Sequence, residues 1–200
     1  MSVAMEKIAL EKERRKGNTM RIRLEETQAL MIDFQKRLMP VIEDQEAIIE
    51  RASLLLSGLS VLKVPVTVTC QYQKGLGETI DSLYTLLEDT EQFDKMSFSC
   101  MEEPPIRKRI TERPALKNVL VFGVEAHICV LQTVTDLAEL GFVPVVVLDC
   151  IGSRRKGDKD AAIRRMEQEG AVFTTAESIL YELTRKAGDK KFKEISRLTK

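Results

Sequence analysis

The sequence predicts an α/β protein with a three-layer α/β/α, Rossmann-like fold built on a six-stranded parallel sheet. Two observations carry this prediction. Short apolar runs that read as buried strands alternate with amphipathic segments that read as helices, most regularly in the second half of the chain. Strands that are apolar throughout are typical of a parallel sheet covered by helices on both faces. For such a sheet we expect the strand order 3-2-1-4-5-6.

Six segments read as strands. The first, Thr27 to Asp33, ends on a carboxylate, and the second, VPVTVTC, begins after Lys63 and is rich in β-branched residues. EQFDK holds a short third strand that ends near Lys95. The fourth, fifth and sixth strands are expected at NVLVFG, VPVVVLD and AVFTT. The even spacing of the last three strands is what makes the α/β alternation regular there.

Amphipathic helices are expected between the strands, at VIEDQEAIIERASLLLSGLSVL, HICVLQTVTDLAELG, DKDAAIRRMEQEG and AESILYELT. Asp158 is expected to cap the third of these. QKGLGE is expected to be a loop, and the Pro104-Pro105 pair is expected to break regular structure before a modest helix over RKRITERP.

Composition and charge exclude several classes of protein. The 31 basic and 31 acidic residues leave no net charge, which argues against a nucleic-acid binder driven by overall charge. The four cysteines are Cys70, Cys100, Cys129 and Cys150, and they form no C-x-x-C pair. No apolar stretch approaches a membrane span or resembles a secretory signal. We therefore expect an intracellular protein with reduced thiols, cytoplasmic or alternatively mitochondrial, without a membrane partner.

The chain divides into three regions by composition. Residues 1-24 are expected to form a charged N-terminal extension, and its glutamates argue against a transit peptide. Residues 25-186 are expected to form the one folded domain. Residues 187-200 are expected to be a charged C-terminal tail, either solvated or docked as a helix, whose five lysines and arginines hint weakly at a polyanion patch.

Three residues stand where ligands bind in an open parallel sheet, beyond the carboxyl ends of the strands. Asp33 ends the first strand, Lys95 follows the third, and Cys129 lies beyond the fourth. Each has a structural alternative: a helix cap for Asp33, a solvated surface residue for Lys95, and a small buried apolar residue for Cys129. His127, the single histidine, is either a base for the thiol or an interior or pocket-lining residue.

Together these residues supply the parts needed for acyl transfer from an amide. A cysteine at a helix N-terminus lies at the positive end of the helix dipole, and an adjacent lysine lowers its pKa further. A nearby aspartate can take the thiol proton and return it to a leaving amine, and backbone N–H groups can bind the oxyanion. We therefore expect Cys129 to be the most reactive of the four thiols.

Several motifs resemble the isochorismatase-like cysteine hydrolases: ALMIDFQ, DKMSFS, FGVEAHICVLQTVTDLAELGFVPVVVLDCIGSR and TTAESILYEL. The stretch CQYQKGLGETI is most similar to the eukaryotic isochorismatase-domain-containing subgroup. The resemblance covers about Thr27 to Thr184 and implies a Rossmann-like six-stranded fold with an Asp-Lys-Cys triad. By motif position, Asp33 would be the general base, Lys95 the charge-stabilising lysine and Cys129 the nucleophile.

The same resemblance implies further features of the site. A cis peptide bond would fall at Val124–Glu125, and the amides of Glu125 and Cys129 would form an oxyanion hole. Metal-binding nicotinamidases of this superfamily carry an aspartate and histidine cluster after the second strand, where this chain has TCQYQKGLG, so we expect no metal and no cofactor. The residues expected to line a substrate pocket are Phe34, Gln71, Tyr72, Phe98 and His127.

The sequence thus predicts a metal-independent cysteine hydrolase that cleaves a small amide or related C–N bond through an acyl-thioester. The first alternative is a catalytically weak member that binds a metabolite or partner. The second is an RNA-associated protein using its lysine-rich ends, against which the zero net charge and the lack of an aromatic RNA-binding signature weigh. The resemblance also implies a homo-oligomer. The apolar helix-face residues Leu131, Val134 and Leu137–Ala138 would lie either at its interface or in the core.

Overall fold

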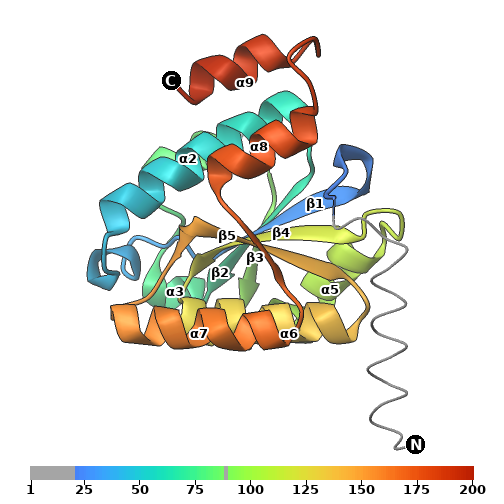
Figure 1. The fold of residues 1–200 in the computed structure, drawn as a ribbon. Coiled ribbons are helices and arrows are strands. Elements are labelled where there is room, and N and C mark those ends of the chain that lie inside the picture. Colours follow the sequence, from blue (N-terminus) through green and yellow to red (C-terminus); the bar gives the residue numbers. More distant parts are fainter. Residues whose placement is uncertain (1–20, 88–89) are drawn as a thin grey trace, which may run out of the picture.

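A six-stranded parallel sheet forms the centre of the computed structural model, which describes residues 21–87 and 90–200 (Figure 1). The strands lie in the order β3-β2-β1-β4-β5-β6, which confirms the predicted fold class and strand order. Their order reverses between the neighbours β1 and β4, so ligands are expected beyond the carboxyl ends of these two strands. The strands are β1 Thr27–Ile32, β2 Val66–Gln71, β3 Gln92–Lys95, β4 Asn118–Val124, β5 Val143–Gly152 and β6 Val172–Thr174.

Helices cover both faces of the sheet (Figure 1). One face carries α2 (Gln45–Leu62) and α8 (Ala176–Thr184), and the other carries α5 (Pro104–Thr111), α6 (Leu131–Glu139) and α7 (Lys156–Gln168). Helix α9 (Phe192–Leu198) lies outside α2 and α8. The shorter elements are α3 Gln73–Leu76, α4 Asp81–Tyr84, the 3₁₀ turns η1 Leu24–Glu26, η2 Met39–Val41 and η3 Cys100–Glu102, and the π-helical turn η4 Ala126–Val130.

The alternation of side chains along the buried strands divides the core between the two faces. In β1, Ala29 and Met31 pack with residues of α2 and α8, whereas Leu30 and Ile32 pack with residues of α5, α6 and α7. Every residue of β1 is buried. A strand covered on both sides needs no polar face, which explains the apolar run from Ala29 to Ile32.

The apolar face of α6 belongs to this core. Leu131, Val134 and Leu137 are buried and pack with the strand residues of that side of the sheet. For these three residues the core interpretation is therefore correct, whereas Ala138 is only partly buried. An interface of the expected homo-oligomer would therefore need surfaces other than these three side chains.

Three local predictions are wrong, for identifiable reasons. Helix α7 begins at Lys156 with Arg155 as its N-cap, so Asp158 lies in the first turn, where a carboxylate still faces the positive end of the helix. Pro104 opens α5, because the N–H that proline lacks has no helical partner in a first turn. The QKGLGE stretch contains the short helix α3.

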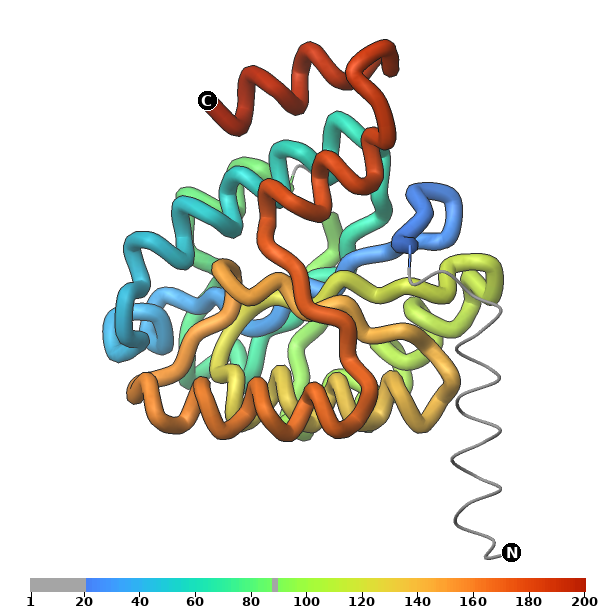
Figure 2. Tube along the Cα trace, viewed as in Figure 1, coloured from blue at the N-terminus to red at the C-terminus, as the bar shows by residue number. Residues whose placement is uncertain are grey.

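The C-terminal segment folds back onto the domain, where it lies along α2 and α8 (Figure 2). Ile195 of α9 is fully buried, and Lys191 Nζ donates a hydrogen bond to the Leu62 carbonyl at 2.9 Å. Residues 192–198 thus form a docked helix. Most of the expected N-terminal extension lies outside the described residues, but Ile22 is buried and its amide donates to Glu182 at 2.9 Å.

Within the described part of the chain, no helix combines the length and the apolar character that crossing a membrane requires. A cavity of about 410 Å³ opens between α2 and the amino ends of β2 and β3. Its wall combines apolar side chains with polar groups, among them Glu91 and Arg109. This cavity shares no residue with the predicted site, which lies at the carboxyl edge of the sheet.

Candidate active site

The three predicted catalytic residues lie at the carboxyl edge of the sheet. Asp33 directly follows β1, Lys95 is the last residue of β3, and Cys129 lies in η4, which connects β4 to α6. All three are buried, with exposed fractions of 0%, 1% and 5%. The surface reading of Lys95 is therefore excluded, because a lysine this deeply buried needs a charged partner.

That partner is Asp33. Lys95 Nζ lies 2.8 Å from Asp33 Oδ2, and neither side chain is exposed to solvent. The ammonium also donates to Gln71 Oε1 at 2.5 Å and to the carbonyls of Ser97 and Phe98, each at 3.3 Å. Four acceptors thus surround a group with three hydrogens, so Lys95 has no hydrogen left to offer a substrate.

The two charges shift each other's pKa. Burial raises the pKa of Asp33 and outweighs the opposing effect of Lys95. Burial lowers the pKa of Lys95, but the carboxylate of Asp33, together with Cys100 and Cys129, more than offsets this, and the net pKa is raised. The ammonium therefore stays charged, while Asp33 is more basic than an ordinary aspartate.

The two oxygens of the Asp33 carboxylate have different partners. Its Oδ1 accepts a hydrogen bond from Thr69 Oγ1 at 2.8 Å, whereas Oδ2 has no hydrogen bond of good geometry among the described residues beyond its ion pair with Lys95. The backbone of Asp33 is in the left-handed region, with φ of 57°. Aspartate tolerates this conformation better than most residues, and the turn directs its side chain back over the sheet edge.

Cys129 lies beside the same group. Its Sγ donates to Gln71 Oε1 at 3.9 Å, and its thiol interacts with the Asp33 carboxylate. Burial and then Asp33 raise the pKa of this thiol, and Lys95 only partly offsets them. Lys95 thus lowers the pKa of Cys129 as predicted, but the expected net lowering is wrong for the resting site, because burial and Asp33 outweigh the lysine. The thiol keeps its proton there.

The other cysteines are buried as well. Burial raises the pKa of Cys100 to about 11, and burial also raises the pKa values of Cys70 and Cys150. Cys100 Sγ lies 3.8 Å from Thr69 Oγ1, which ties it to the Asp33 side of the site. Cys129 is the only one of the four with a measurable exposed fraction.

The loop between β4 and Cys129 has the backbone expected from the resemblance: the Val124–Glu125 peptide bond is cis. The Glu125 carbonyl accepts from the amides of Ile128 and Val130, at 3.0 and 3.3 Å, which shapes the π-helical turn. The Glu125 side chain is buried and pairs through Oε1 with Arg154 Nη2 at 3.0 Å. The segment after β5 thus braces the turn that carries the thiol.

His127 is also bound to that segment. Its Nδ1 lies 3.0 Å from Ser153 Oγ, and its side chain is half-buried. Of the roles considered for His127, this contact favours a pocket-lining residue over a base for the thiol.

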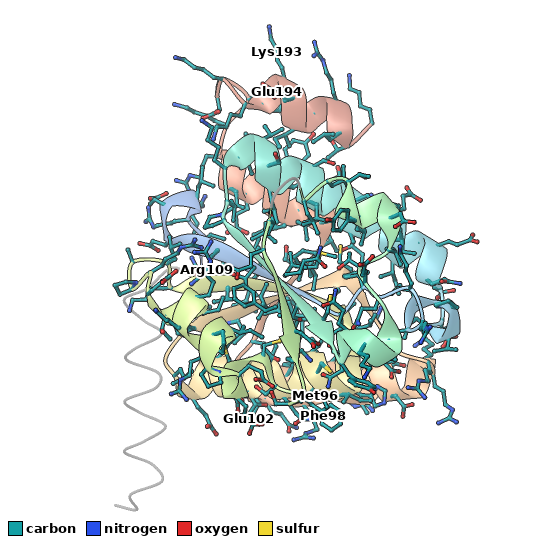
Figure 3. The ribbon with its side chains drawn as sticks, turned by 180° about the vertical axis from the view of Figure 1, so that it is seen from behind. Met96, Phe98, Glu102, Arg109, Lys193 and Glu194 are labelled. Carbon is teal, nitrogen blue, oxygen red and sulfur yellow. The ribbon has the colours of Figure 1, made fainter. Side chains whose placement is uncertain are left out.

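The other residues expected in a substrate pocket fall into two groups. Phe34 is fully buried, and its ring centroid lies 6.2 Å from that of Phe122, so Phe34 is a core residue. Tyr72 and Phe98 are exposed near the ends of β2 and β3, together with Met96. Figure 3 shows Met96 and Phe98 at the same edge of the molecule. These three side chains give the edge an apolar character.

Gln71 is predicted from the sequence to line the pocket, but its hydrogen bond with Lys95 is not predicted, and neither are the contacts of Thr69, Ser153 and Arg154. Thr69 and Gln71 are alternate residues of β2, so both point to the same face, a period-two signal that was visible in the sequence. Arg154 and Ser153 come from a loop that no local signal ties to Cys129. For residues 21–87 and 90–200, no group of three or more His, Cys, Asp or Glu side chains is placed to hold a metal ion.

Comparisons with known proteins identify the family and the fold. The family model for the isochorismatase domain matches residues 27–178, a stretch that contains all three predicted catalytic residues. Isochorismatase family protein 1B of Dictyostelium discoideum is 35% identical over 179 residues, which are 88% of this chain and 87% of that protein. The secreted isochorismatase effector Isc1 of Phytophthora sojae is 38% identical over 156 residues, which are 76% of this chain and 74% of that protein. Among solved structures, MAR1 ribonuclease from Caenorhabditis elegans matches with a TM-score of 0.84 and 37% identity, over 89% of this chain and 91% of that one.

Proposed function

Because this chain belongs to the isochorismatase family and has its hydrolase fold, we propose that it is a metal-independent cysteine hydrolase acting on a small amide or a related C–N bond. The proposed triad consists of Asp33, Lys95 and Cys129. The observation that carries the proposal is the buried ion pair of Asp33 and Lys95 beside the Cys129 thiol. A structural protein gains little from such a pair, because the cost of removing two charges from water roughly cancels their attraction.

In the first step, Cys129 Sγ forms a bond to the carbonyl carbon of the substrate. The thiol is protonated at rest, so its proton must move to Asp33 as the C–S bond forms. Asp33 Oδ2 is the acceptor that we assign, because it has a lone pair free of hydrogen bonds within the described structure and because the pKa of Asp33 is raised. The electrons of the carbonyl double bond move to its oxygen.

In the second step, the C–N bond breaks and its electron pair stays on nitrogen, which takes the proton from Asp33. The acyl group then remains on Cys129 as a thioester. Water gives a proton to Asp33 and attacks the thioester through its oxygen, and the sulfur leaves and recovers that proton. The products are a carboxylic acid and an amine or ammonia.

The negative charge on the substrate oxygen needs donors other than Lys95, whose hydrogens are committed to protein acceptors. We assign this role to the backbone amides of Glu125 and Cys129, in the turn that the Glu125–Arg154 ion pair braces. Lys95 then acts through its positive charge. It keeps Asp33 ionised at rest and stabilises the negative charge that develops in the site during the reaction.

The experiment is a screen of small amides for release of ammonia or amine, with Cys129→Ala compared with the wild type. We expect turnover to fall to background in Cys129→Ala, and to persist in Cys150→Ala, which removes a buried thiol from β5 away from the site. Activity should survive EDTA and be lost on alkylation with iodoacetamide.

Three results would count against this mechanism. Loss of activity on chelation, with recovery on adding zinc or manganese, would show that a metal polarises the substrate. Full turnover by Cys129→Ala would remove the nucleophile. Failure of every amide in the screen, with an intact fold, would favour the catalytically weak binding protein considered from the sequence.

A second candidate function is the processing of RNA. It is favoured by the likeness to a protein named MAR1 ribonuclease and by exposed basic residues on and beside α9, including Lys193 (Figure 3). Incubation with labelled single-stranded RNA tests it. RNA cleavage that persists in Cys129→Ala, without amide turnover in the wild type, would make this candidate the better one.

A further inference from the structure

The side chain of Gln71 connects the Lys95 ammonium to the Cys129 thiol. Its Oε1 accepts from Lys95 Nζ at 2.5 Å and from Cys129 Sγ at 3.9 Å. Its Nε2 donates to the Met96 carbonyl at 2.9 Å. A flipped amide would place NH₂ against the ammonium and the oxygen against a carbonyl, so these neighbours allow only one orientation.

The backbone of Gln71 is held equally firmly. Its N–H donates to Gln35 Oε1 at 2.8 Å, and its carbonyl accepts from Gln35 Nε2 at 3.0 Å. Gln35 is itself fully buried and also donates to the Gly77 carbonyl. The end of β2 therefore cannot shift without breaking this pair of bonds, and Oε1 keeps a fixed position between the charged and the nucleophilic groups.

We propose that Gln71 is a positioning residue for the proposed nucleophile. Its carbonyl oxygen holds the thiol hydrogen in the resting site and holds the Lys95 ammonium against Asp33. The thiol is thereby kept protonated until a substrate is in place. This proposal assigns Gln71 a role beyond lining the pocket, and it rests on Cys129 being the nucleophile.

The physical reason is that Gln71 presents the negative end of its amide dipole to the thiol. A hydrogen bond donated by the thiol stabilises the neutral form, and the partial negative charge of Oε1 disfavours a thiolate beside it. The titratable groups that face the thiol are Asp33 after β1, Lys95 at the end of β3 and Cys100 in η3. Gln71, from β2, is not titratable, but its amide dipole also acts on the thiol. A substitution there changes the field at Cys129 without removing a member of the triad.

The test is the pH dependence of Cys129 alkylation by iodoacetamide, read by peptide mapping. In Gln71→Glu, a side chain of the same shape adds negative charge, so the apparent pKa of Cys129 should rise by about one unit and near-neutral alkylation should slow about tenfold. In Gln71→Met the acceptor is lost and Lys95 acts on the sulfur unopposed, so alkylation should become faster. Gln132→Met, on the exposed side of α6, is the matched control and should leave the profile unchanged.

Opposite changes of the alkylation rate in Gln71→Glu and Gln71→Met would support the positioning role. A general loosening of the site would change the rate in the same direction in both variants. A change of the alkylation rate in the same direction in both variants, or no change relative to Gln132→Met, would overturn the positioning role. If Gln71→Met does not fold, Gln71→Asn withdraws the carbonyl and should also speed alkylation. The measurement needs no substrate, so it is independent of whether amide turnover is found; loss of turnover in Cys129→Ala tests the proposed function separately.

Discussion

Burial determines the chemistry of the residues at this site. Asp33 and Lys95 lie where solvent does not reach them, so each stays charged only because the other is present. The sequence predicted which residues follow the strands and that they meet at one edge. It could not predict that Lys95 is buried or that the pKa of Cys129 is raised, because both depend on how the loop after β3 and the loop after β5 close over the site.

The raised pKa of Asp33 has a consequence for the pH dependence of turnover. Asp33 must be ionised to accept the thiol proton, and a raised pKa means that protonation begins at a higher pH than the ordinary 3.8. We therefore expect kcat/KM to fall on acidification with an apparent pKa above that value. A pH series on the best amide from the screen measures it, with the stability of the fold followed in parallel. An acid limb at or below 3.8 would mean that another group is the base.

At the level of the elements, β1 and β4 approach each other closely beside the site. Gly123 of β4 has φ of 136°, and a Cβ there would lie 2.0 Å from the Ile32 carbonyl oxygen. The two strands meet here directly before Asp33 and before the loop to Cys129, so glycine at this position fixes how close the two halves of the site come. The alternation of apolar runs predicted both strands. The need for glycine at position 123 arises from a contact with a strand that is distant in sequence, so no local sequence pattern predicts it.

We expect Gly123→Ala to destabilise the protein by more than about 4 kcal/mol or to prevent folding, because the clash is with backbone that cannot move without disrupting the sheet. Gly141→Ala is the matched control: Gly141 also has a positive φ, of 82°, but a Cβ there meets nothing within 4 Å. Gly141→Ala should lower the free energy of unfolding by about 1–2 kcal/mol, because only the unfavourable backbone conformation contributes. Urea denaturation compares the two, and equal costs would contradict the steric account.

Across the whole molecule, the two faces of the sheet are covered to different depths. One face has a single layer of helices, whereas α9 adds a further layer over α2 and α8 (Figures 1 and 2). The sequence predicted the overall α/β alternation, but it could not decide between a solvated tail and a docked helix for the C-terminal segment, because the one fully buried residue of α9 stands among charged ones. A single buried side chain produces no periodic signal.

We expect Ile195→Ala to lower the free energy of unfolding by about 2–5 kcal/mol, since it leaves a cavity where α9 meets the core. Leu198→Ala, on the same helix but 38% exposed, should change it by only about 0.5 kcal/mol. Denaturation monitored by circular dichroism gives both values. A negligible effect of Ile195→Ala would mean that α9 is not part of the cooperative unit.

The strand order also constrains how the protein acquires its activity. Asp33 follows β1, Lys95 ends β3 and Cys129 follows β4. These residues are brought together only when β1 pairs with both β2 and β4 and β2 pairs with β3. Each of these pairings closes a long loop, and contacts of such high sequence separation form slowly. A partly folded chain that has only one half of the sheet lacks either the nucleophile or the ion pair. Recovery of activity during refolding therefore reports completion of the sheet centre, whereas helix content can return well before it.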